Sequence, residues 1–149
     1  MDTGSDLRYA RPLDERSLFR QFLHDFYVTR RSLRSRHTDV WEPPTDVYET
    51  EHDIVVKVSV PGVKPGQVAV ECNGEVVTVC GVRKGPDPGS VRRYHQMEIR
   101  NGYFERRLIM RTPFDAQGAH AHYEEGFLYV ILPKAEELVR HVLTIRLDF

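Results

Sequence analysis

The stretch QVAVECNGEVVTVCG, residues 67–81, decides which fold this chain can adopt. Two runs rich in β-branched residues flank Asn73-Gly74, and these two residues tolerate the positive φ angles of a two-residue hairpin turn. A turn at Asn73-Gly74 would place Cys72 opposite Glu75. It would give the hairpin one apolar face, made of Val68, Val70, Val77 and Val79. Because an apolar sheet face must be covered, we expect this hairpin in a sandwich or a barrel.

Further segments with a period of two lie on both sides of the hairpin. Proline and glycine pairs separate them, and proline cannot join an interior ladder. The expected strands are residues 45–49, at a sheet edge, and residues 53–60, 103–110, 119–123 and 127–132. Short strands at this spacing predict an all-β fold, an immunoglobulin-like β-sandwich over residues 41–134.

The residues before the sandwich, 1–40, form an N-terminal arm with a helical period from residue 14 to residue 27. The apolar stripe of this helix is rich in aromatic residues: Leu18, Phe19, Phe22, Leu23, Phe26 and Tyr27. An isolated helix of this length is marginal in water, so it needs a partner surface. We favour a surface on other chains over one on the helix's own domain. Acidic residues on its polar face argue against a membrane surface.

Two segments lack a partner within the predicted sandwich. Residues 91–98, VRRYHQME, follow a loop rich in proline and glycine and alternate only weakly. We expect them to form a strand that pairs outside its own sheet. Residues 135–149 form a C-terminal extension that ends in VLTIRLDF, an apolar alternating segment with no strand left to form a hairpin with.

The composition argues against several classes of function. The net charge is −1, which provides no overall attraction to nucleic acid or to an anionic membrane. No run of about 18 apolar residues is present, so no membrane insertion is expected. Cys72 and Cys80 fall on opposite faces of the hairpin and cannot form a disulfide. Two free thiols with a packing role indicate a reducing, cytoplasmic location.

Metal and catalytic sites are not indicated. His120, His122 and Glu124 share one strand face and could ligate a metal, but the pattern is more typical of a solvated polar face. We therefore expect no metal and no cofactor. The sequence has no nucleophile elbow, P-loop, dinucleotide turn or His-Glu-x-x-His motif, and an enzyme ranks last among the hypotheses.

The motifs, taken in order, resemble the α-crystallin domain of small heat shock proteins. They are PPTDVYE from residue 43, DIVVKVSVPGV from 53, the NG hairpin with G-x-R ending at residue 83, GYFERRL from 102 and AHYEEGFLYVILPK from 121. Three positions depart from the family pattern. Glu125 stands where Asn is usual, and Arg111 stands where a proline is usual. Residues 143–145, Leu-Thr-Ile, replace an Ile-x-Ile motif, with residues 145–147 as a second register.

The resemblance implies an ATP-independent chaperone, a holdase that binds partly unfolded client proteins through the aromatic stripe of the arm. It implies dimers formed by strand exchange, with an interface of Val91, Arg93, Tyr94, His95, Met97 and Arg106. Larger homo-oligomers would use a tail anchor of Leu143, Ile145 and Leu147. That anchor would lie in a groove of the next dimer, lined by Val68, Val70, Ala121 and Tyr123. The alternative is a monomeric β-sandwich co-chaperone or adaptor that binds one folded partner.

Overall fold

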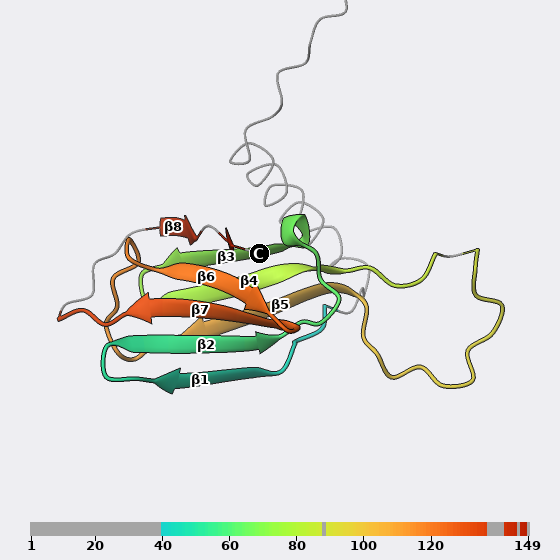
Figure 1. Ribbon diagram of the computed structural model, residues 1–149, viewed down its shortest axis with the longest axis horizontal. Helices are drawn as coiled ribbons and strands as arrows, with labels where there is room; N and C mark the ends of the chain where they lie inside the picture. Colours follow the sequence, from blue (N-terminus) through green and yellow to red (C-terminus); the bar gives the residue numbers. More distant parts are fainter. Residues whose placement is uncertain (1–39, 88, 137–141, 146, 149) are drawn as a thin grey trace, which may run out of the picture.

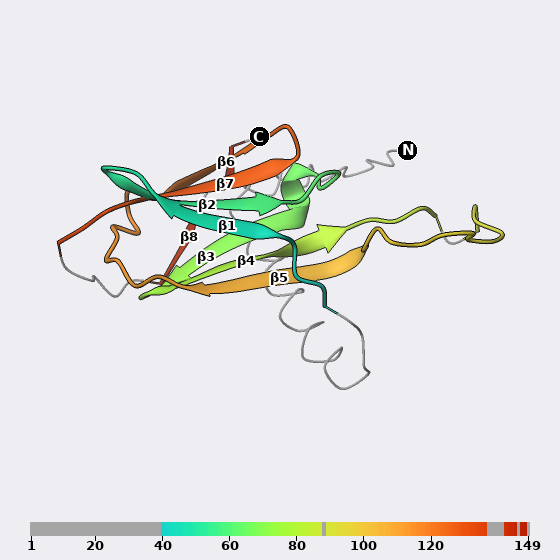
Figure 2. The same cartoon turned by 90° about the horizontal axis from the view of Figure 1, so that it is seen from below.

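A computed structural model describes residues 40–87, 89–136, 142–145 and 147–148. Two β-sheets pack face to face (Figures 1 and 2). The five-stranded sheet has the order β1-β2-β7-β6-β9, and the four-stranded sheet has the order β5-β4-β3-β8. The predicted all-β class and the β-sandwich architecture are confirmed. The predicted N-terminal helix lies outside the described residues.

The strands follow the period-two segments of the sequence closely. The five-stranded sheet contains β1 (Thr45–Glu49), β2 (Asp53–Ser59), β6 (His120–Glu124), β7 (Phe127–Pro133) and β9 (Leu147–Asp148). The four-stranded sheet contains β3 (Val68–Asn73), β4 (Val76–Arg83), β5 (Gly102–Ile109) and β8 (Val142–Ile145). A short 3-10 helix, η1 (Pro65–Gln67), leads into β3. Neighbouring strands are antiparallel except β6 and β9, which are parallel.

The β3–β4 hairpin forms, but its predicted register is wrong by two residues. Asn73 pairs with Val76, so the two-residue loop is Gly74-Glu75 and not Asn73-Gly74. Gly74 is the only one of these loop residues with a positive φ, +60°, and a glycine at the first central position is what a type II′ turn requires. A shift of two residues preserves the faces of both strands, so the predicted apolar face is still the buried one.

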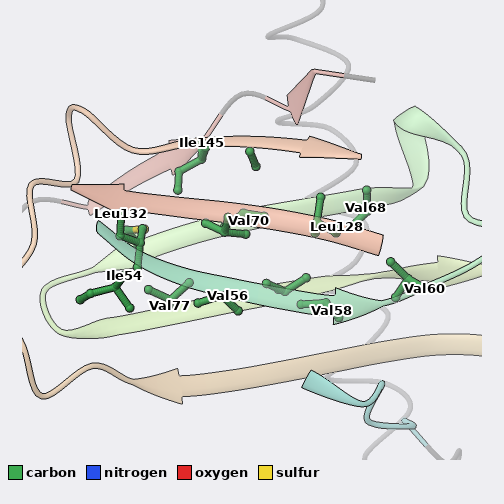
Figure 3. Packing of buried hydrophobic residues seen from close by; sticks show 14 of the residues in the cluster. Ile54, Val56, Val58, Val60, Val68, Val70, Val77, Leu128, Leu132 and Ile145 are labelled. Atoms are coloured by element: carbon green, nitrogen blue, oxygen red, sulfur yellow. The ribbon is translucent and has the colours of Figure 1, made fainter. Parts of the chain in front are cut away.

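The core lies between the two sheets, and valine is its most frequent residue (Figure 3). Alternate residues of the central strands point inward, and those that are completely buried include Val56, Val70, Val79, Leu128 and Leu132. Burial of each such side chain contributes roughly 1.5–3 kcal/mol. Phe104 of β5 is also completely buried, and Trp41 packs against it with the ring centroids 5.3 Å apart. This contact joins the segment before β1 to the edge of the four-stranded sheet.

The β6–β7 turn forms in spite of an unfavourable residue. Glu125 has φ +50° and Gly126 has φ +87°, so both central residues occupy the left-handed region that a type I′ turn demands. Glutamate rarely adopts this conformation, whereas asparagine and glycine do so readily. The pairing of β6 with β7 therefore enforces the turn, and the left-handed conformation of Glu125 lowers the stability of the folded chain locally.

Candidate functional site

The first feature is the segment between β4 and β5, residues 84–101, which contributes no residue to the hydrophobic core; we call it the exchange loop. It projects away from the sandwich (Figures 1 and 2). Residues 91–98, predicted as a strand, have no strand partner within the described part of the chain. The loop's large apolar side chains are in solvent, with Tyr94 49%, Met97 67% and Ile99 72% exposed.

The other residues predicted for strand exchange are placed along the same loop, with one exception. Arg93 and His95 are exposed and Val91 is half-buried. Ile99 was missed by the sequence reasoning, although Met97-x-Ile99 is a short apolar alternation that could have extended the predicted segment. Arg106 lies outside the loop, on β5.

Arg106 forms an ion pair inside its own chain. Its Nη1 lies 3.2 Å from Oε2 of Glu42, and its side chain is 29% exposed. The Nε atom is buried and has no hydrogen-bond partner among the described residues. Arg106 was predicted to form an ion pair across a dimer interface; within the single chain its carboxylate partner is Glu42, and its buried Nε is left without a partner among the described residues.

The free edge of β1 is the second feature. β1 is the last strand of the five-stranded sheet, and no other described strand pairs with its outer side. Val47 and Tyr48, at the centre of β1, are each 46% exposed. An unpaired edge with exposed apolar side chains is a template for pairing with another strand.

Arg83 fixes the base of the exchange loop, and sequence reasoning did not single it out beyond the G-x-R motif. Its guanidinium lies 4.3 Å from the centroid of the Trp41 ring. Its Nη1 donates a hydrogen bond to the carbonyl oxygen of Pro61 over 3.3 Å, and its Nε donates to the carbonyl oxygen of Arg100 over 2.9 Å. Nη2 donates to the same Arg100 oxygen. Burial lowers the pKa of Arg83 from its usual value.

The third feature is the pair of strand edges, on β3 and β6, along which the tail pairs. We call it the tail groove, and its predicted lining is Val68, Val70, Ala121 and Tyr123. The first three are buried in the core, while Tyr123 is half-buried and donates its hydroxyl to the carbonyl oxygen of Val60 over 3.2 Å. Val68, Val70 and Ala121 belong to the hydrophobic core cluster of the whole sandwich, and Tyr123 packs against it. Val70 and Ala121 also provide backbone at the two edges.

The chain's own tail occupies this groove. β8 pairs with β3, with Ile145 opposite Val70, and β9 pairs with β6, with Leu147 opposite Ala121. Ile145 is 4% exposed and points from β8 into the core (Figure 3), while Leu147 packs half-buried against the same cluster. The backbone of Leu143 lies opposite Cys72, but its side chain is not among those described. The sequence predicted these anchor residues in the groove of a neighbouring dimer, so the arrangement within one chain was not foreseen.

The remaining polar candidates show no convergent geometry in the described residues. Cys72 and Cys80 are both free and buried, and burial, with a smaller effect of the Glu71 charge, raises the pKa of Cys72 to about 12. The His122 ring stacks on Tyr129 with the centroids 5.0 Å apart. No group of three or more metal-ligating side chains occurs in the part of the chain that is described. Within that part, no helix is both long and apolar enough to cross a membrane.

The residues predicted to bind clients, Leu18 to Tyr27 of the arm, lie outside the described residues. The candidate site therefore comprises the exchange loop, the β1 edge and the tail groove. The exchange loop and the β1 edge are open to a strand of another polypeptide, whereas the edges of the tail groove are paired with the chain's own tail.

The chain is similar in sequence and in fold to several known proteins. The chain is 24% identical to small heat shock protein C2 of Rickettsia felis over 91% of this chain and 86% of that protein. It is 35% identical to the 19.0 kDa class II heat shock protein of rice over 71% of this chain and 65% of that protein. A solved structure of a small heat-shock protein from Xylella fastidiosa superposes with a TM-score of 0.59. The two chains are 26% identical, and the match covers 70% of this chain and 97% of that one.

The match to a family model spans almost the whole described sandwich. The Hsp20/alpha crystallin family model covers residues 46–147, from β1 through the tail groove and its occupant. This range contains every motif on which the sequence resemblance rests except Pro43, Pro44 and Thr45, the first three residues of the PPTDVYE motif. The chain therefore belongs to the Hsp20/alpha crystallin family, the small heat shock proteins.

Proposed function

We propose that this protein is an ATP-independent chaperone, a holdase that assembles into homo-oligomers and binds unfolding client proteins. The observation that carries the proposal is the family match over residues 46–147. The exposed large apolar residues of the described sandwich lie on the exchange loop and on the edge strands β1 and β5. Since Cys72 and Cys80 are free thiols, we assign the protein to a reducing compartment such as the cytoplasm.

Dimers would form when the exchange loop of one chain adds its strand to the β1 edge of another. Two observations support this step. The loop places Tyr94, Met97 and Ile99 in solvent, and the β1 edge carries the half-exposed Val47 and Tyr48. Pairing would satisfy the backbone of both segments and bury these side chains together. The unused Nε donor of Arg106 would be available for a group of the partner chain.

Larger assemblies would use the tail anchor, and clients would bind the aromatic stripe of the N-terminal arm. Each tail presents two apolar side chains, Ile145 and Leu147, at a spacing that suits an extended strand. Single contacts of this size are weak, so an oligomer would depend on many of them acting together. Client binding through apolar contact is unspecific, which is what a holdase requires.

The activity is tested by light scattering of a heat-denaturing enzyme with and without this protein and without ATP. We expect suppression of aggregation at near-stoichiometric amounts. Size-exclusion chromatography with light scattering tests the assembly. A large oligomer that shrinks to dimers when residues 143–149 are deleted supports the proposal. A monomer for both proteins, with no protection of the client, would favour the adaptor alternative.

The strand-exchange step has its own matched variants. Tyr94→Ala and Met97→Ala should each weaken the dimer by roughly 5- to 30-fold, since buried interface anchors typically cost at least about 1–2 kcal/mol on truncation. Gln96→Ala, an exposed polar residue of the same loop, should leave the dissociation constant unchanged. Equal effects of all three variants would argue against a specific apolar interface at this loop.

A further inference from the structure

The exchange loop and the β1 edge carry charges of opposite sign. Residues 84–101 contain four basic and two acidic residues, which gives the exchange loop a net charge of +2. Residues 42–53, which include β1 and the turn after it, contain five acidic residues and no lysine or arginine, a net charge of −5. Surfaces of opposite charge attract each other before contact, and surfaces of like charge reject each other.

Ion pairs within the chain neutralise the two ends of the β1 edge but not its centre. Glu42, before β1, lies 3.2 Å from Nη1 of Arg106, and Glu49, at the end of β1, lies 2.9 Å from Nζ of Lys134. Asp46 lies between these two carboxylates on β1, at the border of the sheet (Figure 1). It is exposed and forms no ion pair with a residue that the structure describes.

Lys57 is the direct cross-strand neighbour of Asp46, yet its ammonium group binds elsewhere. Its Nζ lies 4.2 Å from the ring centroid of Phe127 and 5.7 Å from that of Tyr129. The negative faces of aromatic rings attract a cation in this position. The carboxylate of Asp46 is therefore left uncompensated, on the same face of β1 as the half-exposed Tyr48.

Arg92 and Arg93 of the exchange loop provide matching cations. Both are exposed, and neither forms an ion pair within the described part of the chain. Consecutive residues of an extended strand point to opposite faces, so one of the two arginines lies on the Asp46 face whichever side of the loop turns outward. Charged side chains on paired strands interact when they lie directly opposite or on the diagonal.

We propose that the charge pairing between Arg92 and Arg93 of one chain and Asp46 of another determines which chains exchange strands. This inference rests on the proposed strand exchange. A second copy of this chain fits the β1 edge because it brings a basic loop, whereas a related chain with an acidic loop would place like charges side by side. The pairing selects the partner more than it strengthens the dimer, since exposed ion pairs contribute little each and are screened by salt.

Charge reversal in the full-length protein tests the pairing. The loop variant carries Arg92→Glu and Arg93→Glu, and the edge variant carries Asp46→Lys and Glu51→Lys. Glu51 is included because it is an exposed carboxylate of the turn after β1 that pairs with no lysine or arginine among the described residues. Each variant alone brings like charges together, so its dimer dissociation constant should rise at least about 10-fold.

A matched control changes the net charge by the same amount as the loop variant, but away from the β1 edge. Lys64→Glu with Arg107→Glu serves this purpose, because both residues are exposed and Arg107 points away from the core on the outer face of the four-stranded sheet. The control should stay within about twofold of wild type, as expected for screened surface charges. Donor- and acceptor-labelled chains, each labelled at the N-terminus, report the dissociation constant by energy transfer.

A mixture of the loop variant and the edge variant decides the question. The reversed loop then meets the reversed edge, and the native loop meets the native edge. Heterodimers should therefore form with a dissociation constant within about threefold of wild type, which also shows that both variants fold. The differences should shrink at about 1 M salt, where the Debye length is only about 3 Å. A mixture as weak as either variant alone, or a control as weak as the loop variant, would overturn the charge pairing.

Failure of the charge pairing and failure of the proposed function give different results. Client protection by a dimer that does not respond to charge reversal would leave the function standing and remove the charge pairing. Recovery of the dimer on mixing, without client protection, would do the reverse.

Discussion

Gly81 is a position in the described sandwich at which a single added methyl group should be strongly destabilising. It lies in β4, between Val68 of β3 and Phe104 of β5. A Cβ atom added there would lie 2.2 Å from the carbonyl oxygen of Gln67 and 2.6 Å from Cζ of the completely buried Phe104. The first neighbour is backbone of η1 and cannot rotate away. The second fills the core beside Trp41 and has no free volume into which it could move.

The expected loss in Gly81→Ala follows from two opposing effects. Overpacking of a filled core typically costs 1–3 kcal/mol, and we place this case at about 3 kcal/mol because a backbone atom is involved. Gly81 does not have a positive φ, so alanine can adopt its backbone conformation. Alanine also lowers the conformational entropy of the unfolded chain, which offsets about 0.4–1 kcal/mol of the lost stability. The net destabilisation should be about 2 kcal/mol. In a chain of 149 residues this corresponds to a fall in Tm of roughly 4–8 °C.

Gly66→Ala is the matched control, because a Cβ at Gly66 would meet no heavy atom within 4 Å and its φ is not positive. It should be neutral or more stable by up to about 1 kcal/mol. Urea unfolding is followed by the fluorescence of Trp41, the only tryptophan, and by circular dichroism at one fixed subunit concentration, since assembly is linked to stability. A Gly81→Ala protein within 0.5 kcal/mol of wild type, or an equal loss in both variants, would refute the packing argument.

Three further outcomes are expected. Arg83→Met should lose about 1–2 kcal/mol, since charged hydrogen bonds to carbonyl oxygens disappear, and should speed amide exchange at the base of the exchange loop; unchanged exchange there would contradict the role given to Arg83. Glu125→Asn should raise stability by about 0.5 kcal/mol in thermal unfolding because asparagine accepts the φ of +50° more readily, and a loss would show that the turn is not strained. The Cys72 thiol has a pKa of about 12 in the folded chain against 9.0 as a reference, so the unfolded chain loses its proton first and stability falls above pH 9. The fall should be up to about 1.4 kcal/mol per pH unit steeper than in Cys72→Ala, and equal slopes in urea titrations would exclude this linkage.

Local patterns were sufficient to predict the strands and the segments left outside the core. Alternation and the Pro-Gly boundaries act within a few residues, so β1 to β7 could be found without knowledge of their neighbours. The buried face of the hairpin was predicted correctly although the register was not, because a slip of two residues leaves each side chain on its original face. The exposure of Tyr94 and Met97 likewise follows from a charged, poorly alternating segment after a loop of prolines and glycines.

Contacts between distant residues could not be read from the chain in the same way. Arg83 meets Trp41, Pro61 and Arg100, which no periodicity connects, and its geometry exists only once both sheets have packed. The position at which the tail pairs also depends on the tertiary structure. The edges of β3 and β6 belong to different sheets, and they form one slot only because the sandwich holds them side by side. The apolar side chains of Ile145 and Leu147 by themselves indicate that these residues are stabilised by burial. The surface that the tail can reach depends on distances in the folded chain, and a sequence pattern does not contain those distances.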